Sequence, residues 1–445
     1  MPLEIKQRLD EYKVNPVKVF LILCLLAVPG LTMPAADTAP SALSFDWGGR
    51  VKAAGTRFFP EAGTLYHDVD SGPYDDVSLD ARLNLAVISD TGAQLDIHYE
   101  TIFAGGDFRE VRTTLLGGGT PGSGLFPDQT VEDDRRLMDL TATIYENDRQ
   151  YGYHRIDRLV LTLTPAWGTL RIGRQALTWG NGLIFNPMDV FNPFSPTDVD
   201  RDYKVGDDMI AGTLLTPGGG EIQLVGVARK APDDADVEVD NASFAIKYHD
   251  MVNSLEYDIM GARHFEDYIL GLGTSGYLKD AAWRMDATYT FLADGRSDPG
   301  FWSYMANLDY SWVWWDKNLY GLIEFYTNTL GVDHPMDALS NPDLIERVAR
   351  GEIHTLGMSY LGASVQIELH PLVNLHLTSI TDLHGPSGIL QPRLIWDVRD
   401  NLQLTTGVNK YWGGGDTEFG GFSLPFTDTQ LKPLDGIYLW LTCFF

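Results

Sequence analysis

Apolar and polar residues alternate with a period of two along much of the chain. Between Val77 and Val87, apolar residues occupy the odd positions, and polar or charged residues fill most of the even ones. The same pattern recurs at 94–103 and 283–291. Strict alternation over about ten residues indicates a β-strand with one apolar and one polar face. Because about eighteen such segments can be identified, the sequence predicts an all-β fold.

Two all-β architectures could use strands of this kind. In a soluble sandwich the apolar face would form the core, whereas in an outer-membrane barrel it meets lipid and the polar face lines a wet interior. Aromatic residues gather near strand ends, as at Trp312, Trp314, Trp315 and Tyr320, which is typical of an interfacial girdle. Strands of about 9 to 11 residues fit a tilted membrane crossing. We therefore expect a transmembrane antiparallel β-barrel of about 16 to 18 strands.

The lengths of the connections support a count of eighteen. Every second connection is short, with the sequences SDTG, PAWG, PGGG, HDMV, SGYLK, WWDK, HPLV and DVRD. The long connections all fall at the other end, at 55–75, 105–153, 177–207, 329–351 and 412–435. Short periplasmic turns and long outer loops are typical of such barrels. We interpret the apolar-patterned stretch 137–147 as part of a structured outer loop, because another ring strand there would reverse every later loop.

The last ten residues, GIYLWLTCFF, alternate again and end on an aromatic residue. This stretch resembles the C-terminal strand signal of Gram-negative outer-membrane proteins. We expect the barrel-assembly machinery and outer-membrane lipid or lipopolysaccharide to be partners of the chain. The candidate insertion-signal residues are Tyr438, Trp440, Phe444 and Phe445.

The N-terminus has the order of a signal peptide. Lys13 and Lys18 precede an apolar run at 19–28, which is followed by Pro29, Gly30 and small residues. This order predicts a signal peptide over 1–36, a barrel over 37–445 and a location in the Gram-negative outer membrane. An uncleaved anchor helix is the alternative.

Composition excludes several function classes. A formal net charge of -28 argues against a nucleic-acid partner, because phosphate binding needs clustered Lys and Arg. No P-loop, GxGxxG or HExxH motif occurs, and the ten histidines are scattered rather than grouped with a Ser and an acid. The run Asp198, Asp200 and Asp202 does not complete a calcium loop, since Tyr203 and Met209 stand where Gly and Glu are needed. We expect no catalytic residue, no cofactor and no metal site.

Charges of both signs fall on the polar strand faces, among them Arg50, Arg82, Glu100 and Asp286. They could pair with one another and solvate the interior, or they could form a selectivity track for a polar solute. The mixture argues against a pore lined only by arginines.

The segment GRQALTWGNGLIFNPMDVFNPFSPTDVDRDYKVGDD, residues 173–208, does not alternate. Its prolines and glycines favour extended and turn conformations, while its apolar residues are not expected to stay in water on a free loop. We predict that 177–207 folds into the barrel mouth as a constriction or partial plug; a rigid outer cap is the alternative. The candidate pore and constriction residues are Arg158, Arg171, Arg174, Gln175, Trp179, Asn186, Asp189, Asn192, Asp198, Asp200, Arg201, Asp202 and Lys204.

The same segment carries a family resemblance. Its GRQ, WG and NP-x-D elements resemble the GRQ-x-x-x-WG...NP-x-D signature of uncharacterised, porin-like proteobacterial outer-membrane barrels, which are distantly similar to alginate-export porins. Many of these are encoded beside RND-type exporters. The resemblance implies a channel that passes or exports a small or amphipathic solute. The alternatives are a non-channel barrel that acts as partner of an inner-membrane RND-type exporter, or an outer-membrane enzyme.

Overall fold

A computed structural model of the chain describes residues 43–117, 133–191, 193, 195–197, 203–230, 237, 239–296, 298–423 and 429–445. Residues Leu43–Phe445 form one compact unit. The predicted signal peptide at 1–36 lies outside the described residues. No helix in the described part of the chain is long and apolar enough to cross a membrane.

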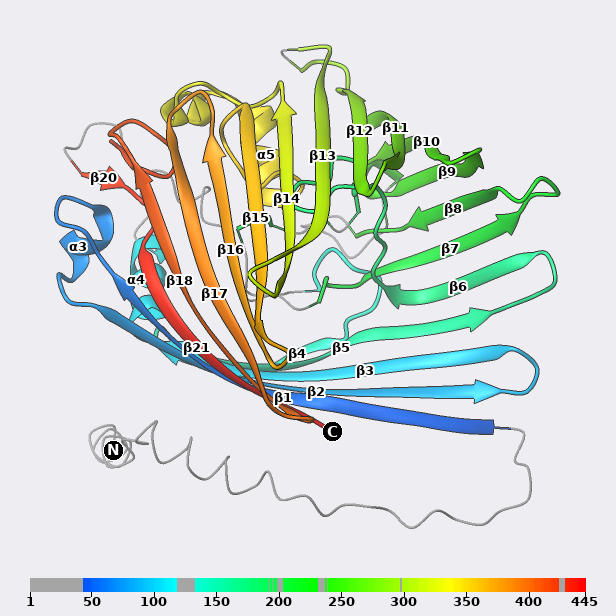
Figure 1. Cartoon of the computed structure of the whole chain (residues 1–445), viewed down its shortest axis with the longest axis horizontal. Helices are drawn as coiled ribbons and strands as arrows, with labels where there is room; N and C mark the ends of the chain where they lie inside the picture. Colours follow the sequence, from blue (N-terminus) through cyan, green and yellow to red (C-terminus); the bar gives the residue numbers. More distant parts are fainter. Residues whose placement is uncertain are drawn as a thin grey trace, which may run out of the picture. The chain divides into compact units, whose positions relative to one another are not determined.

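Eighteen antiparallel strands form a closed ring (Figure 1). The last of them, β21, pairs with β1 on one side and with β18 on the other, which closes the sheet. This confirms the predicted fold class and strand count. The ring strands are β1 (Leu43–Phe59), β2 (Tyr74–Ser89), β3 (Ala93–Gly106), β5 (Gln150–Leu163), β6 (Gly168–Gln175), β7 (Asp207–Leu215), β8 (Glu221–Val227), β9 (Ser243–Val252), β10 (Leu255–His264), β11 (Asp267–Leu278), β12 (Ala281–Phe291), β13 (Gly300–Trp314), β14 (Lys317–Asn328), β15 (Ser359–His370), β16 (Val373–Asp382), β17 (Ser387–Arg399), β18 (Leu402–Gly413) and β21 (Asp435–Phe444).

The two faces of the strands differ as the alternation predicts. Apolar residues such as Ile259 and Leu272 point outward and are more than half exposed, at 53% and 56%. The buried residues Asp258 and Asp286 occupy the opposite face. A soluble sandwich would bury its apolar face and expose its polar one, so the arrangement excludes that alternative. A band of exposed apolar side chains around a closed barrel is suited to lipid.

The connections are short at one end of the barrel and long at the other. The β13–β14 turn consists of Trp315 and Asp316, both with φ near +50°, as in the two-residue turns that match strand twist. Trp314 stacks on Trp315 with 4.2 Å between ring centroids, next to the turn. The long connections contain the remaining elements: α3 (Leu65–Val69), α4 (Asp107–Gly117), β4 (Thr141–Glu146), η2 (Val239–Asn241), η3 (Pro335–Ser340), α5 (Pro342–Arg350), β19 (Phe422–Ser423) and β20 (Gln430–Leu431).

The stretch interpreted as a structured outer loop contains a strand, β4, that is not part of the ring. β6 pairs with residues 159–163 of β5, and β4 pairs with residues 151–155 of the same strand. β4 therefore occupies the edge of β5 that β6 leaves unpaired. The order of the later loops is unaffected.

The connection predicted at 329–351 is longer in the structure. A strand was expected to follow it directly, whereas β15 begins at Ser359. The backbone N–H groups of Leu356 and Gly357 instead donate to the two carboxylate oxygens of Glu418, at 2.9 and 3.2 Å. A buried acid from another long connection thus takes donors that the sheet would otherwise use.

Candidate functional site: a loop across the lumen

The connection between β6 and β7, residues 176–206, is here called the plug loop. It joins Gln175 to Asp207, within one residue of the predicted 177–207. Its described residues bond to Asp286, Glu324 and Gln391, which lie well inside strands β12, β14 and β17. Because these contacts lie at mid-strand positions, and β17 lies across the ring from β6 and β7, the loop enters the barrel and does not merely cap its mouth.

The firmest contact joins the plug loop to β14. The backbone N–H groups of Leu183, Ile184 and Phe185 donate to the Glu324 carboxylate at 2.8, 3.1 and 2.6 Å. The side-chain amide of Asn307 donates to the same carboxylate at 3.0 Å. Glu324 is fully buried. A buried carboxylate with several amide donors is well satisfied, so this contact is a strong attachment.

A second carboxylate holds the preceding turn. Asn181 donates from its backbone N–H and from its side-chain amide to the two oxygens of Asp286, both at 2.7 Å. Further along the loop, the side chain of Gln391 donates to the carbonyl of Thr197 at 3.0 Å. The plug loop is therefore bonded to three separate parts of the wall.

Apolar side chains of the loop pack on the wall next to these bonds. Phe185 stacks on Tyr326 with 4.5 Å between ring centroids. Met188 is completely buried in a cluster with apolar residues of β7 to β11, and Trp179 meets Phe191 edge to face. Leu183 is the exception, since it is half exposed. The apolar residues of this non-repetitive segment thus act mainly as anchors.

The end of the loop is held by charged groups. Lys204 forms a buried ion pair with Asp189 within the loop. Arg158, on β5, donates to the carbonyl of Lys204 at 2.5 Å. The ring of Tyr203 lies under the guanidinium groups of Arg50 and Arg82, 4.8 and 4.3 Å from its centroid. Cations over an aromatic face are attracted by the ring's quadrupole.

Most inward-facing charges on the first strands are paired. Arg82 contacts Asp157 at 2.6 Å and Glu100 at 3.3 Å, and Glu100 also binds Arg155 at 2.5 Å. Within the described residues, Arg171 makes no side-chain bond, and Asp189, one of the predicted constriction residues, is paired. The structure therefore favours mutual pairing for Arg82 and its neighbours over a continuous selectivity track.

Arg174 does not face the lumen. It shares a strand face with Ile172, which is exposed on the outside of the barrel. Its guanidinium binds Asp208 at 2.8 Å and Asp133 at 2.9 Å. The pKa of Asp133 would rise on burial, but hydrogen bonds from Arg136 and Arg174 lower it to about 2. Arg174 is thus a buried clamp for the segment that leads to β4, and the prediction of a pore role for it is wrong.

The other candidate residues lie at the loop or near it. Gln175 is buried where the loop begins and donates to the Met209 carbonyl. Asn186 donates to the Trp179 carbonyl at 2.7 Å and so closes a turn within the loop. Several predicted candidates lie outside the described residues: Asn192, Asp198, Asp200, Arg201 and Asp202.

The C-terminal residues form the seam of the ring. Tyr438 and Trp440 are buried and face inward, and the Lys52 ammonium lies 4.4 Å from the Trp440 ring centroid. Phe444 and Phe445 are exposed. The role of these four residues as an insertion signal remains a prediction.

A hydrogen-bond network around His264 was not predicted from the sequence. Ser243 Oγ lies 2.9 Å from His264 Nδ1, and His264 Nε2 lies 3.4 Å from Glu352 Oε1. Ser243 is fully buried and accepts a 2.6 Å bond from Arg229, so it is not placed as a nucleophile. Burial alone would raise the pKa of Glu352, but its bond to His264 and the nearby Arg350 and Arg347 lower it. Long sequence separations hid this network, which ties residues 351–355 to the wall.

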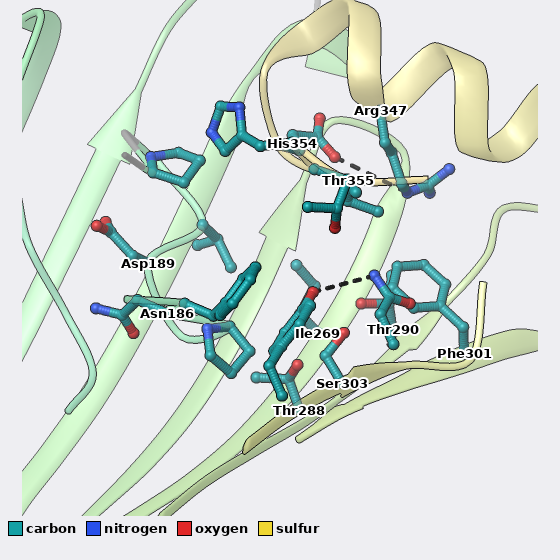
Figure 2. Close-up of a pocket in the computed structure, with 18 of the residues that line it drawn as sticks. Asn186, Asp189, Ile269, Thr288, Thr290, Phe301, Ser303, Arg347, His354 and Thr355 are labelled. Carbon is teal, nitrogen blue, oxygen red and sulfur yellow. Dashed lines mark hydrogen bonds and ion pairs between the residues drawn. The ribbon is translucent and has the colours of Figure 1, made fainter. Parts of the chain in front are cut away.

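A cavity of about 90 Å³ lies between the plug loop, strands β10 to β14 and residues 352–355 (Figure 2). It is bordered by the NP-x-D part of the loop, at Asn186, Pro187 and Asp189.

Comparison with known proteins shows a similarity in fold alone. No family model and no curated protein sequence matches the chain. Among solved structures, the chain is similar to OccAB4 of Acinetobacter baumannii, with 10% identity and a TM-score of 0.51 over 90% of this chain and 98% of that one. It is also similar to a BenF-like porin from Pseudomonas fluorescens Pf-5, with 10% identity and a TM-score of 0.50 over 91% and 98% of the two chains. OccAB1 of Acinetobacter baumannii matches at 8% identity and a TM-score of 0.50, over 90% and 96%. The chain therefore has the fold of an outer-membrane porin.

Proposed function

We propose that the chain is an outer-membrane channel for a small or amphipathic solute, with the plug loop as its constriction. The observation that carries the proposal is the triple amide bond to Glu324, because it holds the loop inside the barrel. An eighteen-stranded barrel is wide enough that an internal loop is needed to restrict flow. Similarity to porins in fold supports the same conclusion by analogy. The solute passes without covalent change.

The proposal also includes a cellular location and binding partners. A porin-like barrel belongs in the outer membrane of a Gram-negative bacterium, and we propose that residues 1–36 direct it there as a signal peptide. Lipopolysaccharide, the barrel-assembly machinery and an inner-membrane exporter are proposed partners. A distant relationship to alginate-export porins rests on the GRQ-x-x-x-WG...NP-x-D elements alone.

Conductance of the purified protein in lipid bilayers tests the channel. We would compare the wild type with a Glu324→Ala variant in which residues 181–200 are also replaced by a Gly/Ser linker of equal length. This keeps the chain length while removing the acceptor of the three N–H groups and the loop side chains that pack on the wall. Circular dichroism would establish that both are folded β-barrels. We expect the wild type to conduct weakly and the variant strongly. Absence of conductance from both would refute the channel, and equal conductance would refute the constriction.

A further inference from the structure

The cavity beside the plug loop has a hydroxyl-bearing floor. Thr288 on β12 is the direct cross-strand partner of Ser303 on β13, which is in turn the partner of Asn328 on β14. All three residues are buried and line the cavity. Neighbouring strands are spaced by about 4.8 Å, so the three polar side chains form a row with that spacing. Figure 2 shows Thr288 and Ser303 on one side of the cavity and Thr355 on the other.

Part of the hydrogen-bonding capacity of this floor is unused. Asn328 donates to the Tyr326 hydroxyl at 3.4 Å and accepts from Leu330 N–H at 2.9 Å. The hydroxyl groups of Thr288 and of the nearby Thr290 make no side-chain hydrogen bond to the described residues. Hydroxyl groups that line a cavity and have no partner in the protein are available to bond to water or to a guest molecule.

The plug loop contributes five apolar side chains to the lining, beside the polar residues Asn186 and Asp189: Phe185, Pro187, Val190, Pro193 and Pro196. A molecule in the cavity would therefore meet hydroxyl groups of the wall and hydrocarbon groups of the loop. Such a combination of a mostly apolar surface with a few placed polar groups is typical of small-molecule sites.

The charged groups around the cavity are already paired. Arg347 binds Asp267, and His264 approaches Glu352 at 3.4 Å. Asp189 is neutralised by Lys204, as described above. A charged ligand would therefore lose its hydration and meet no unpaired opposite charge among these groups.

We propose that this cavity is a binding site for a small neutral polyol, of about three to five carbon atoms, or for the hydroxylated edge of a larger sugar. Thr288, Thr290 and Ser303 bond to neighbouring hydroxyls of the ligand, and the prolines and Phe185 contact its C–H groups. A cavity of about 90 Å³ is several times the roughly 10–15 Å³ that one water molecule needs, so it leaves room for a ligand of a few carbon atoms. The site lies between the plug loop and the barrel wall. Its role as an intermediate binding site for the transported solute depends on the proposed channel function.

Three four-carbon probes separate the chemistry of the ligand. Erythritol carries four hydroxyls, butane-1,4-diol lacks the two inner ones, and tartrate keeps the two inner ones but has carboxylates in place of the terminal CH₂OH groups. Binding to the full chain in detergent micelles would be measured by saturation-transfer NMR. We expect erythritol to bind, butane-1,4-diol to bind more weakly, and tartrate not to bind. Equal binding of erythritol and butane-1,4-diol, or preference for tartrate, would overturn the proposal.

Two variants locate the site. Thr288→Val keeps the shape of the side chain but removes its hydroxyl, and is expected to weaken erythritol binding about three- to tenfold, the loss of one neutral hydrogen bond. Thr405→Val is the matched control, because Thr405 is a buried threonine on β18 that does not line the cavity. Equal weakening by both variants, or by neither, would overturn the assignment to this cavity.

Failure of the site and failure of the channel give different results. Conductance without erythritol binding would leave the channel standing and remove the polyol site. Erythritol binding that depends on Thr288, in a protein without conductance, would support the site and refute the channel.

Discussion

Removing the charge of Glu324 should release the plug loop. In Glu324→Gln, one amide oxygen can still accept from Ile184 and Phe185, but the new NH₂ group replaces the oxygen that accepts from Leu183 and Asn307. The Leu183 N–H and the Asn307 amide, both hydrogen-bond donors, would then face the NH₂ group, which is also a donor. The side chain keeps almost the same volume, so packing around β14 is little changed.

The expected magnitude follows from the number and type of these bonds. A hydrogen bond to a charged group contributes roughly 1.5 to 3 kcal/mol, and a neutral one about 1 kcal/mol. Losing one charged bond and weakening two others amounts to about 4 kcal/mol. Since each 1.4 kcal/mol is a factor of ten, detachment of residues 183–185 should become roughly a thousandfold more frequent.

Hydrogen exchange and conductance measure this effect. Amide exchange at residues 183–185 reports detachment directly, and mean conductance should rise with it. Glu368→Gln is the control, because this carboxylate on β15 binds Asn318 and makes no described contact with the plug loop. If Glu324→Gln left both exchange and conductance as in the wild type, the attachment of the loop through Glu324 would be refuted.

Three further predictions concern other contacts. Burial raises the pKa of Glu418 to about 7, so its contribution to stability is present below the usual pKa near 4.5 and is lost as pH rises through about 7. Glu418→Gln should therefore have the same unfolding free energy as the wild type at pH 4 and an unfolding free energy about 3 kcal/mol higher at pH 9, measured through the melting temperature. An equal difference at both pH values would contradict this. Arg174→Met leaves Asp208 buried without its cation and Asp133 with Arg136 alone, which should lower the unfolding free energy by about 3 kcal/mol in urea titrations, and an unchanged midpoint would disprove the clamp. Lys204→Met should destabilise the loop because Asp189 loses the Lys204 ammonium, seen as faster amide exchange at 203–206, whereas unaltered exchange would show that the ion pair is dispensable.

The barrel was predictable because its signal is repeated many times. Each strand has the same period of two, and an error at one strand is exposed by the loop lengths that follow it. The errors occur where a single side chain from a distant part of the chain decides the local structure. Glu418 draws residues 356 and 357 away from the sheet, and no local pattern announces it.

The site was predictable in place but not in its contacts. Prolines and apolar residues in one segment indicated an inward loop, yet its main wall partner, Glu324, is one charged residue in an ordinary alternating strand. Arg174 shows the converse case. Its motif suggested a role in the pore, but strand parity turns it outward, where the segment leading to β4 covers it.

The irregular conformation of the plug loop is itself the basis of its attachment. Gly182 and the Asn186–Pro187 pair confine residues 183–185 to a stretch too short for a helix or a strand. Their backbone N–H groups consequently have no partner within the loop, and buried amide groups require one. Glu324 is buried in the wall and requires hydrogen-bond donors, because a carboxylate without donors is strongly unfavourable there. Each group thus satisfies the other, so a segment that formed regular structure would lose the donors that hold it across the lumen.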